Sequence, residues 1–234
     1  MQITKELVDK INKLLDEGLV CGLGNPIPGK MCVEALICHA LDLPHGDEPN
    51  CVSPAVRSLK IRLNDSNWSS NKARAEGMRN LAVLQLGTNN NFSDVDFTHK
   101  VAMFSCCEFL PFFLRDIDKE KKWFTEELES GLRNAKTLEE AKNAAADAAD
   151  DADDAADAAT AAADAADDAA AYAADAAATA TDAAAYAADA ATAYAAAYAD
   201  DAADKYLILF AKGIEKILIE MNVPGKDFIQ PCLA

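Results

Sequence analysis

The side chains best suited to ligand chemistry lie between His45 and Arg79. Arginines in this stretch could bind an anionic group through paired hydrogen bonds, and a tryptophan could stack on a ligand. The same residues could instead form ion pairs and helix caps in a small helical domain, and we favour this structural interpretation. The candidate ligand-binding residues are His45, Asp47, Arg57, Arg62, Asn64, Asp65, Trp68 and Arg74.

A phosphate-loop pattern, G-x4-G-K, runs from Gly24 to Lys30, and a helix is expected after it. That pattern requires a serine or threonine next, to hold magnesium, whereas this chain has Met31. Two prolines in the loop also remove backbone N–H groups that would bind phosphate. A rigid turn ahead of a helix explains these residues better than a nucleotide site.

Cysteines and histidines in the same region could form a metal site or a nucleophilic pair. The candidates are Cys32, Cys38, His39, His45 and Cys51. No C-x2-C pair is present, and six residues on a helix point Cys32 and Cys38 to different faces. His45 and Cys51 flank one polar turn, so they could meet there. Buried thiols explain most of these residues, so we expect no metal, no cofactor and no catalytic residue.

The most biased stretch is 143–204, whose 62 residues are 38 Ala, 15 Asp, four Tyr, four Thr and one Asn. Aspartates occupy two registers of a seven-residue repeat and alanines fill three others, which predicts a helix with a methyl strip opposite a carboxylate face. Because alanine is the best helix former, we expect one long rod or a helical hairpin. The strip would let a partner helix approach closely. This alanine seam comprises Ala159, Ala162, Ala166, Ala169, Ala173, Ala176, Ala180 and Ala183.

The net charge of −17 is concentrated in that stretch, which contributes −15. The other residues carry 22 basic and 24 acidic side chains, so we expect no direct binding to nucleic acid. The acidic face could attract a basic protein partner or imitate the charge of DNA. We expect no signal peptide and no membrane span, and seven cysteines without framework spacing indicate reduced thiols in the cytoplasm.

Every element that the sequence predicts is a helix, so the fold class is all-α. Caps are expected at Thr4, Ser53, Ser69 or Ser70, and Thr137, and a kink is expected at Pro111. A hydrophobic closing helix could dock on the N-terminal part or close a dimer. The expected organisation is a helical globular domain (1–136), an Ala/Asp-rich helical tract (137–204), and a closing amphipathic helix and tail (205–234). Before the tract, helices are expected over about 4–18, 31–41, 53–65, 69–86, 94–115 and 119–134.

The motifs PGKMCVEALICHALDLPHGDEPNCV, RLNDSNWSS and RAEGMRNLAVLQLGT resemble an uncharacterised protein family of bacteria and their phages. Its members join such an N-terminal module to an alanine-rich tract and a closing helix that ends near Pro-Gly. The likeness covers residues 24–88 and, more loosely, 213–225. The resemblance implies a bacterial or phage protein inside the cell, and it implies no activity.

We therefore expect a non-enzymatic helical interaction or assembly protein that forms homo-oligomers through the alanine seam. One alternative is an acidic decoy that imitates DNA and inhibits a nucleic-acid-binding protein. The other alternative is a small-molecule-binding protein or an enzyme that uses the region 45–79.

Overall fold

The computed structural model describes residues 2–117, 124–150 and 200–229. Every regular element in these ranges is helical, and the one β feature among them is an isolated antiparallel bridge between Gly24 and Met31. The predicted all-α class is therefore confirmed. The alanine seam, and with it the choice between a rod and a hairpin, lies outside the described residues.

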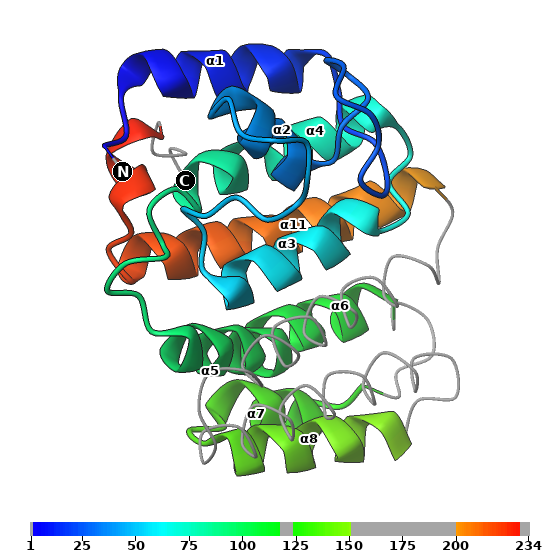
Figure 1. Ribbon diagram of the computed structural model, residues 1–234. Helices are drawn as coiled ribbons and strands as arrows, with labels where there is room; N and C mark the ends of the chain where they lie inside the picture. The colour runs from blue at the N-terminus through cyan, green and yellow to red at the C-terminus, as the bar shows by residue number, and fades with distance from the viewer. Residues whose placement is uncertain (1, 118–123, 151–199, 230–234) are drawn as a thin grey trace.

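The helices follow one another closely along the chain (Figure 1). They are α1 (Lys5–Asp16), α2 (Val33–Ala40), α3 (Pro54–Asp65), α4 (Asn71–Leu84), α5 (Asp94–Phe104), the π-helical turn η1 (Ser105–Phe109), α6 (Leu110–Ile117), α7 (Glu126–Asn134), α8 (Leu138–Asp150), α11 (Asp200–Glu220) and the 3-10 turn η2 (Pro224–Phe228).

Hydroxyl caps begin these helices where the sequence predicts them. The hydroxyl oxygens of Thr4, Ser53, Ser70 and Thr137 each accept a hydrogen bond from the backbone N–H three residues later. The Glu140 carboxylate accepts the backbone N–H just before the Thr137 cap at 2.7 Å. Each cap satisfies an N–H that the helix itself leaves free, which contributes about 1 kcal/mol.

The irregular turn near Pro111 lies earlier than expected. Instead of a kink at Pro111, the chain forms a π-helical turn over Ser105–Phe109, and Pro111 occupies the first turn of α6. A helical proline donates no hydrogen bond, and its ring clashes with the carbonyl four residues back. The wider π turn ahead of the proline avoids that clash, and Leu110 N–H accordingly bonds to Ser105 O, five residues back.

The helix expected over 119–134 begins later, because Thr125 caps α7. The Thr125 hydroxyl accepts the Leu128 N–H at 3.2 Å, so the helix starts at Glu126. Phe124, just before the cap, is buried, and the Arg115 guanidinium lies 5.0 Å from the centre of its ring. Residues 118–123 lie outside the described ranges.

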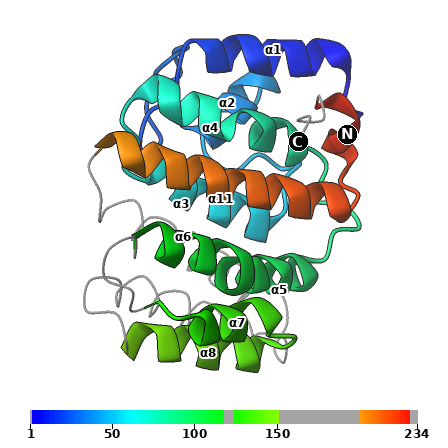
Figure 2. The same ribbon diagram turned by 180° about the vertical axis from the view of Figure 1, so that it is seen from behind.

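The described helices stack in layers from α1 at one end to α7 and α8 at the other, with α11 in the middle (Figures 1 and 2). Helix α11 packs most extensively against α4 and also contacts α5. Its residues Tyr206, Phe210, Ile214 and Leu218 are buried in the same hydrophobic cluster as α1 to α5. The closing helix is therefore docked on the N-terminal helices and supplies part of their core.

Candidate functional site

Three predicted ligand-binding residues fasten the end of α3 to the loop that precedes α2. The Asn64 side chain bonds to backbone groups on both sides of this loop at 3.2 and 2.9 Å. The Asp65 carboxylate accepts the Gly22 N–H at 2.8 Å. Arg74 donates to the carbonyl oxygens of Asn64 at 2.7 Å and of Leu19 at 3.2 Å. These polar groups thus satisfy the backbone of a loop that crosses the end of α3.

Trp68 is buried and has no free face for stacking on a ligand. Its side chain is 5% exposed, and its Nε1 donates to the Leu63 carbonyl at 2.8 Å. The far edge of the indole lies against Gly77, where an added Cβ would come within 2.2 Å of the ring. The absence of a side chain at Gly77 is therefore what makes room for Trp68.

The other candidates are spread around this region. The His45 Nε2 lies 3.2 Å from the Gly24 carbonyl oxygen, and Arg57 forms an ion pair with Glu48 at 2.8 Å. Arg62 is exposed on α3. A crevice of about 30 Å³, roughly the volume of one water, lies between the loop and α3. It brings together three of the eight predicted residues, and it is lined in part by Asp47, Asn64, Asp65, Cys32 and Gly22.

The loop with the phosphate-binding pattern uses its amides internally. Asn25 N–H bonds to Lys30 O at 2.6 Å, Ile27 N–H to Asn25 O at 2.7 Å, and Lys30 N–H to Ile27 O at 2.9 Å. Pro26 and Pro28 have no N–H to offer. Three N–H groups of the loop are thus already bonded and two are absent, which fits the interpretation as a rigid turn.

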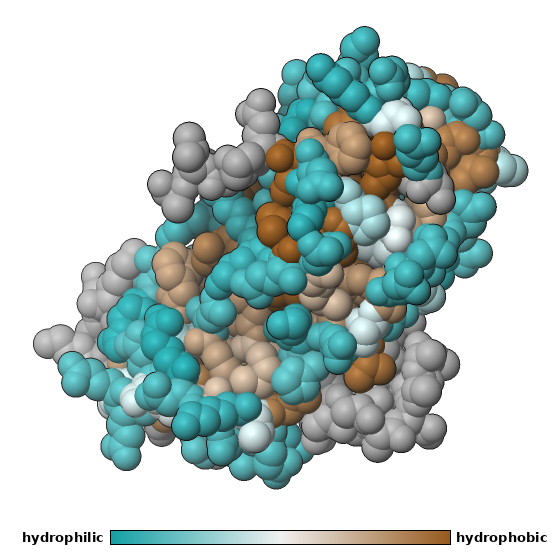
Figure 3. Space-filling model, turned by 90° about the vertical axis from the view of Figure 1, so that its left-hand side faces the viewer, coloured by the Kyte–Doolittle hydropathy of each residue, from teal (hydrophilic) through white to brown (hydrophobic). Residues whose placement is uncertain are grey.

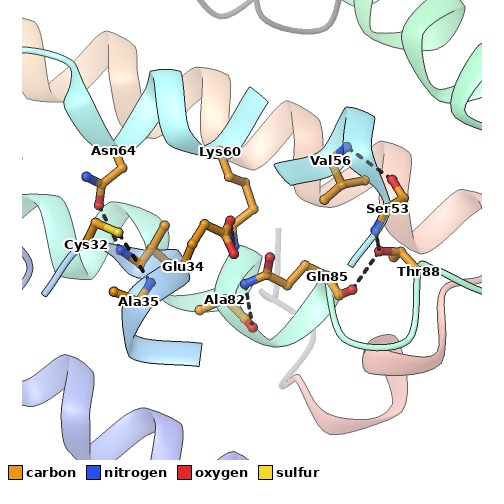
Figure 4. Close-up of polar contacts among 11 residues, drawn as sticks. Cys32, Glu34, Ala35, Ser53, Val56, Lys60, Asn64, Ala82, Gln85 and Thr88 are labelled. Atoms are coloured by element: carbon orange, nitrogen blue, oxygen red, sulfur yellow. Dashed lines mark hydrogen bonds and ion pairs between the residues drawn. The ribbon is translucent and has the colours of Figure 1, made fainter. Parts of the chain in front are cut away.

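A buried ion pair between α2 and α3 was not predicted from the sequence (Figure 4). Lys60 Nζ donates to Glu34 Oε1 at 3.0 Å, and both side chains are 0% exposed. Within the described ranges, Glu34 Oε2 and Gln85 Oε1 have no hydrogen-bond partner. Burial raises the pKa of Glu34 and lowers the pKa of Lys60, and the attraction between the two opposes both shifts. The sequence feature that could have indicated this ion pair is Glu34, a single glutamate in the apolar run MCVEALICHAL.

The described cysteines are free thiols, and most are poorly suited to nucleophilic chemistry. Burial raises the pKa of Cys38 to about 11, of Cys106 to about 12 and of Cys107 to about 11. Because the thiolate is the reactive form, these groups are inert near neutral pH. No group of three or more His, Cys, Asp or Glu side chains within the described residues could hold a metal ion.

Thiol labelling tests this difference in exposure. In a Cys232→Ser background at pH 8, we expect the exposed Cys21 to react first with a chromogenic disulfide. A pKa raised from 9.0 to about 11 lowers the thiolate fraction about 100-fold, so Cys38 and Cys107 should react far more slowly. The further substitution Cys21→Ser should abolish the fast phase. A fast phase that survives it would contradict the burial of the other thiols.

The helices α1 to α8, α11 and η2 pack together, and we call them the body. The start of α11, where the chain re-enters the body, is held by polar contacts that we call the tract root. The Asp204 carboxylate accepts the Ser69 N–H at 2.9 Å and also the Ser69 hydroxyl. Lys205 Nζ donates to Asp116 Oδ2 at 2.6 Å, and the Tyr206 hydroxyl donates to the same oxygen at 2.5 Å. Three consecutive residues therefore fix this end of the tract to the start of α4 and to α6.

The opposite end of the tract leaves the body through α8. Leu138, Ala141 and Ala145 are buried, and α8 packs against α7, α5 and η1. Leu138 and Tyr206 belong to one hydrophobic cluster. Both ends of the tract are thus attached to a single folded body.

Removal of the shared acceptor should loosen the tract root. Asp116→Ala removes the partner of both Lys205 and Tyr206, and we expect a loss of about 1–2 kcal/mol in the free energy of unfolding. Lys205→Ala should cost less than about 1 kcal/mol, because this lysine is largely exposed. Urea unfolding measures both. Equal losses for the two variants would contradict the role assigned to Tyr206.

Three open grooves among the described residues are larger than the crevice, and none is lined by a predicted ligand-binding residue. One of about 340 Å³ lies between α5 and α11, one of about 350 Å³ lies between the start of α5 and Met221, and one of about 620 Å³ lies beside α1, α4 and η2. On the face in Figure 3, hydrophobic residues form separate areas with hydrophilic residues between them. Among the described helices, none combines the length and apolar character needed to cross a bilayer.

The sequence matches no family model, and no curated protein or solved structure is similar enough to match it. The resemblance to a bacterial and phage family therefore gains no support from these comparisons.

Proposed function

We propose that this protein is a non-enzymatic interaction and assembly protein whose Ala/Asp-rich tract self-associates through its alanine seam. The observation that carries the proposal is that α8 and α11, which contain the two ends of the tract, both pack into one folded body. A segment fixed at both ends is presented at a defined place, which lowers the entropy cost of binding. The body is then a support, and the tract is the contact surface.

The chemistry of the body supports a non-enzymatic role. Trp68 and Arg74 are engaged in structural contacts, and several thiols have raised pKa values. The crevice near Asp47 has room for about one water. A small-molecule site or an enzyme in the region 45–79 is therefore the alternative that the contacts favour least.

The physics of the seam favours assembly over an isolated helix. Each alanine buries one methyl group, so a single seam contributes little, and several helices must pack together to gain stability. Small side chains allow the helix axes to approach closely. Because residues 143–204 of each copy carry a charge of −15, copies repel one another in dilute buffer. We therefore expect association to strengthen as salt screens this repulsion.

Charges placed on the seam test the proposal. The triple variant Ala169→Glu, Ala176→Glu and Ala183→Glu would bury carboxylates in the contact, and should reduce the molar mass measured by sedimentation equilibrium to that of a monomer. The matched control is Ala171→Glu, Ala178→Glu and Ala185→Glu, which adds the same charge in a register that carries aspartate elsewhere in the tract. Equal masses for the two triple variants would overturn the seam as the contact.

An acidic decoy is the second candidate, favoured by the clustering of 15 of the 39 acidic residues between positions 143 and 204. A decoy should bind a basic DNA-binding protein in a salt-sensitive way, in competition with duplex DNA. With protamine on fluorescent duplex DNA as the probe, the decoy hypothesis expects the protein to release DNA at low salt, where protamine alone keeps the DNA bound. Persistence of the DNA complex would leave assembly as the function. We also propose a cytoplasmic location, which fits the free thiols.

A further inference from the structure

The loop from Cys21 to Lys30 displays apolar side chains at the surface. Leu23 is 41% exposed and Ile27 is 51% exposed, and both prolines of the loop are exposed as well. Leu23 and Ile27 are two of four large hydrophobic side chains that are exposed in the described residues. We call residues 21–30 the apolar loop.

The apolar loop is closed by its own backbone. Asn25 N–H bonds to Lys30 O at 2.6 Å, Lys30 N–H to Ile27 O at 2.9 Å, and Cys32 N–H to Leu23 O at 3.2 Å. These bonds connect the two sides of the loop to each other. These main-chain bonds therefore hold the backbone at Leu23 and Ile27.

Glycines make this conformation specific to the sequence. Gly24 has φ of +71°, and an added Cβ would lie 2.2 Å from the Lys30 carbonyl oxygen. Gly29 has φ of +75°, and its Cβ would lie 2.8 Å from the Glu17 carbonyl oxygen. Other L-residues are strained at such φ values and would clash here. The loop is therefore built to hold one shape while its apolar side chains contact solvent.

The base of the apolar loop is attached to α3 and to the start of α2. The Asp65 carboxylate accepts the Gly22 N–H at 2.8 Å, and Val20 N–H bonds to Met31 O at 3.0 Å. The His45 imidazole contacts the Gly24 carbonyl oxygen at 3.2 Å. The ordering cost of the loop is thus met during folding, so a partner that covers it does not have to order it.

Carboxylates surround the base of this loop. Asp47 and Asp65 line the crevice that also contacts Leu23. Asp65 is the last residue of α3, and Ser69 in the following connection binds Asp204 of the tract root. The apolar loop and the start of α11 accordingly lie at the same end of the molecule in both ribbon views (Figures 1 and 2). The loop itself carries one cation, Lys30.

We propose that the apolar loop is a docking site for a second protein, one that offers an apolar pocket with lysine or arginine side chains around its rim. Ile27 and Leu23 would enter the pocket, since buried aliphatic side chains at the centre of a contact supply most of its affinity. The basic rim would face Asp47, Asp65 and Asp204, which sets orientation and speeds association. This contact does not involve the alanine seam, so each can fail without the other.

A displayed library of disulfide-constrained random peptides, selected on the full-length protein, tests the proposal. Peptides that also bind the double variant Leu23→Ser/Ile27→Ser are removed by counter-selection. The two substituted side chains are exposed, so the thermal unfolding of this variant should match that of the wild type. Ile219→Ser on α11 is the matched control, because this isoleucine is equally exposed and lies outside the loop. Binding is measured by fluorescence anisotropy at low and high salt.

The proposal expects selected peptides that combine aliphatic or aromatic residues with lysine or arginine. Their affinity should fall at least about tenfold in Leu23→Ser/Ile27→Ser, stay unchanged in Ile219→Ser and weaken with salt. Peptides that bind both serine variants equally, peptides without basic residues, or no enrichment over the double variant would each overturn it. A wild-type mass that falls to the monomer in the double variant would mean that a second copy occupies the loop, which also overturns it.

Discussion

Lys60→Met is expected to destabilise the body by about 3–5 kcal/mol, although methionine fills a similar volume. The reason is the carboxylate left behind. Glu34 is fully buried, and Lys60 Nζ at 3.0 Å is the donor that compensates its charge. Without that donor, Glu34 must either stay ionised in an apolar surrounding or take up a proton. Urea unfolding at neutral pH measures the loss.

The pH dependence of this variant has a definite sign. Burial already raises the pKa of Glu34 above 4.5, and loss of the lysine raises it further. A group whose pKa is raised on folding stabilises the protein below its unfolded pKa, and that stabilisation disappears as pH increases. The deficit of Lys60→Met relative to the wild type should therefore be smallest near pH 4 and grow towards pH 7.

The control for the ion pair is a double replacement. Glu34→Leu combined with Lys60→Met removes both charges and the unpaired Glu34 Oε2 together. Apolar replacement of a whole buried pair is commonly neutral or stabilising, so this variant should be much more stable than Lys60→Met alone. A double variant as unstable as the single one would show that side-chain shape, and not charge, governs this position.

Gly213→Ala is expected to destabilise the protein by about 1–3 kcal/mol, against the usual gain from alanine in a helix. An added Cβ at Gly213 would lie 1.9 Å from the ring of Phe104. The centroid of that ring lies 5.7 Å from the ring of Phe210 and 6.2 Å from that of Phe109, so the ring would have to leave these aromatic contacts to make room. The packing of α11 on α5 would have to shift.

Two further glycines complete this comparison. Gly77→Ala should also destabilise, because the new Cβ would lie 2.2 Å from the buried Trp68 ring. Gly131→Ala in α7 meets its nearest neighbour, Ala144, at an ordinary 3.8 Å, so it should stabilise by up to about 1 kcal/mol. Thermal unfolding of the three variants measures the two expected losses and the one expected gain in stability. A Gly213→Ala protein as stable as Gly131→Ala would contradict the close packing of α11.

Local signals in the sequence predicted much of the fold. Hydroxyl residues ahead of apolar periodic stretches located the starts of α1, α3, α4 and α8, since a cap depends on neighbours only three residues away. The hydrophobic face that begins at Tyr206 likewise indicated a helix able to dock on the body. The register of the π turn could not be predicted, because it depends on how the chain accommodates Pro111 within a packed helix.

Long-range pairings could not be predicted from one sequence. Glu34 and Lys60 lie on different helices, and Asp116 meets Tyr206 across 90 positions. The candidate residues in the region 45–79 were chosen by type, yet type does not say whether a group faces solvent or its own backbone. Trp68 could be a stacking surface or a core residue, and its fit against Gly77 places it in the core.

We propose that the tract, and not the body, assembles the protein. The most direct test is the molar mass from light scattering of the full chain and of a chain in which residues 151–199 are replaced by about 20 Gly/Ser residues. An internal deletion is needed because truncation would remove α11 and its core residues. A linker of about 20 residues has a root-mean-square span of roughly 25 Å and can extend further.

We predict that the full chain is an oligomer at moderate salt. The deleted chain should be a monomer whose thermal unfolding is as cooperative as that of the full chain. This pair of results would place the contact in the tract. A full chain that is monomeric at all concentrations and salt levels would contradict assembly, and so would a deleted chain that keeps the mass of an oligomer.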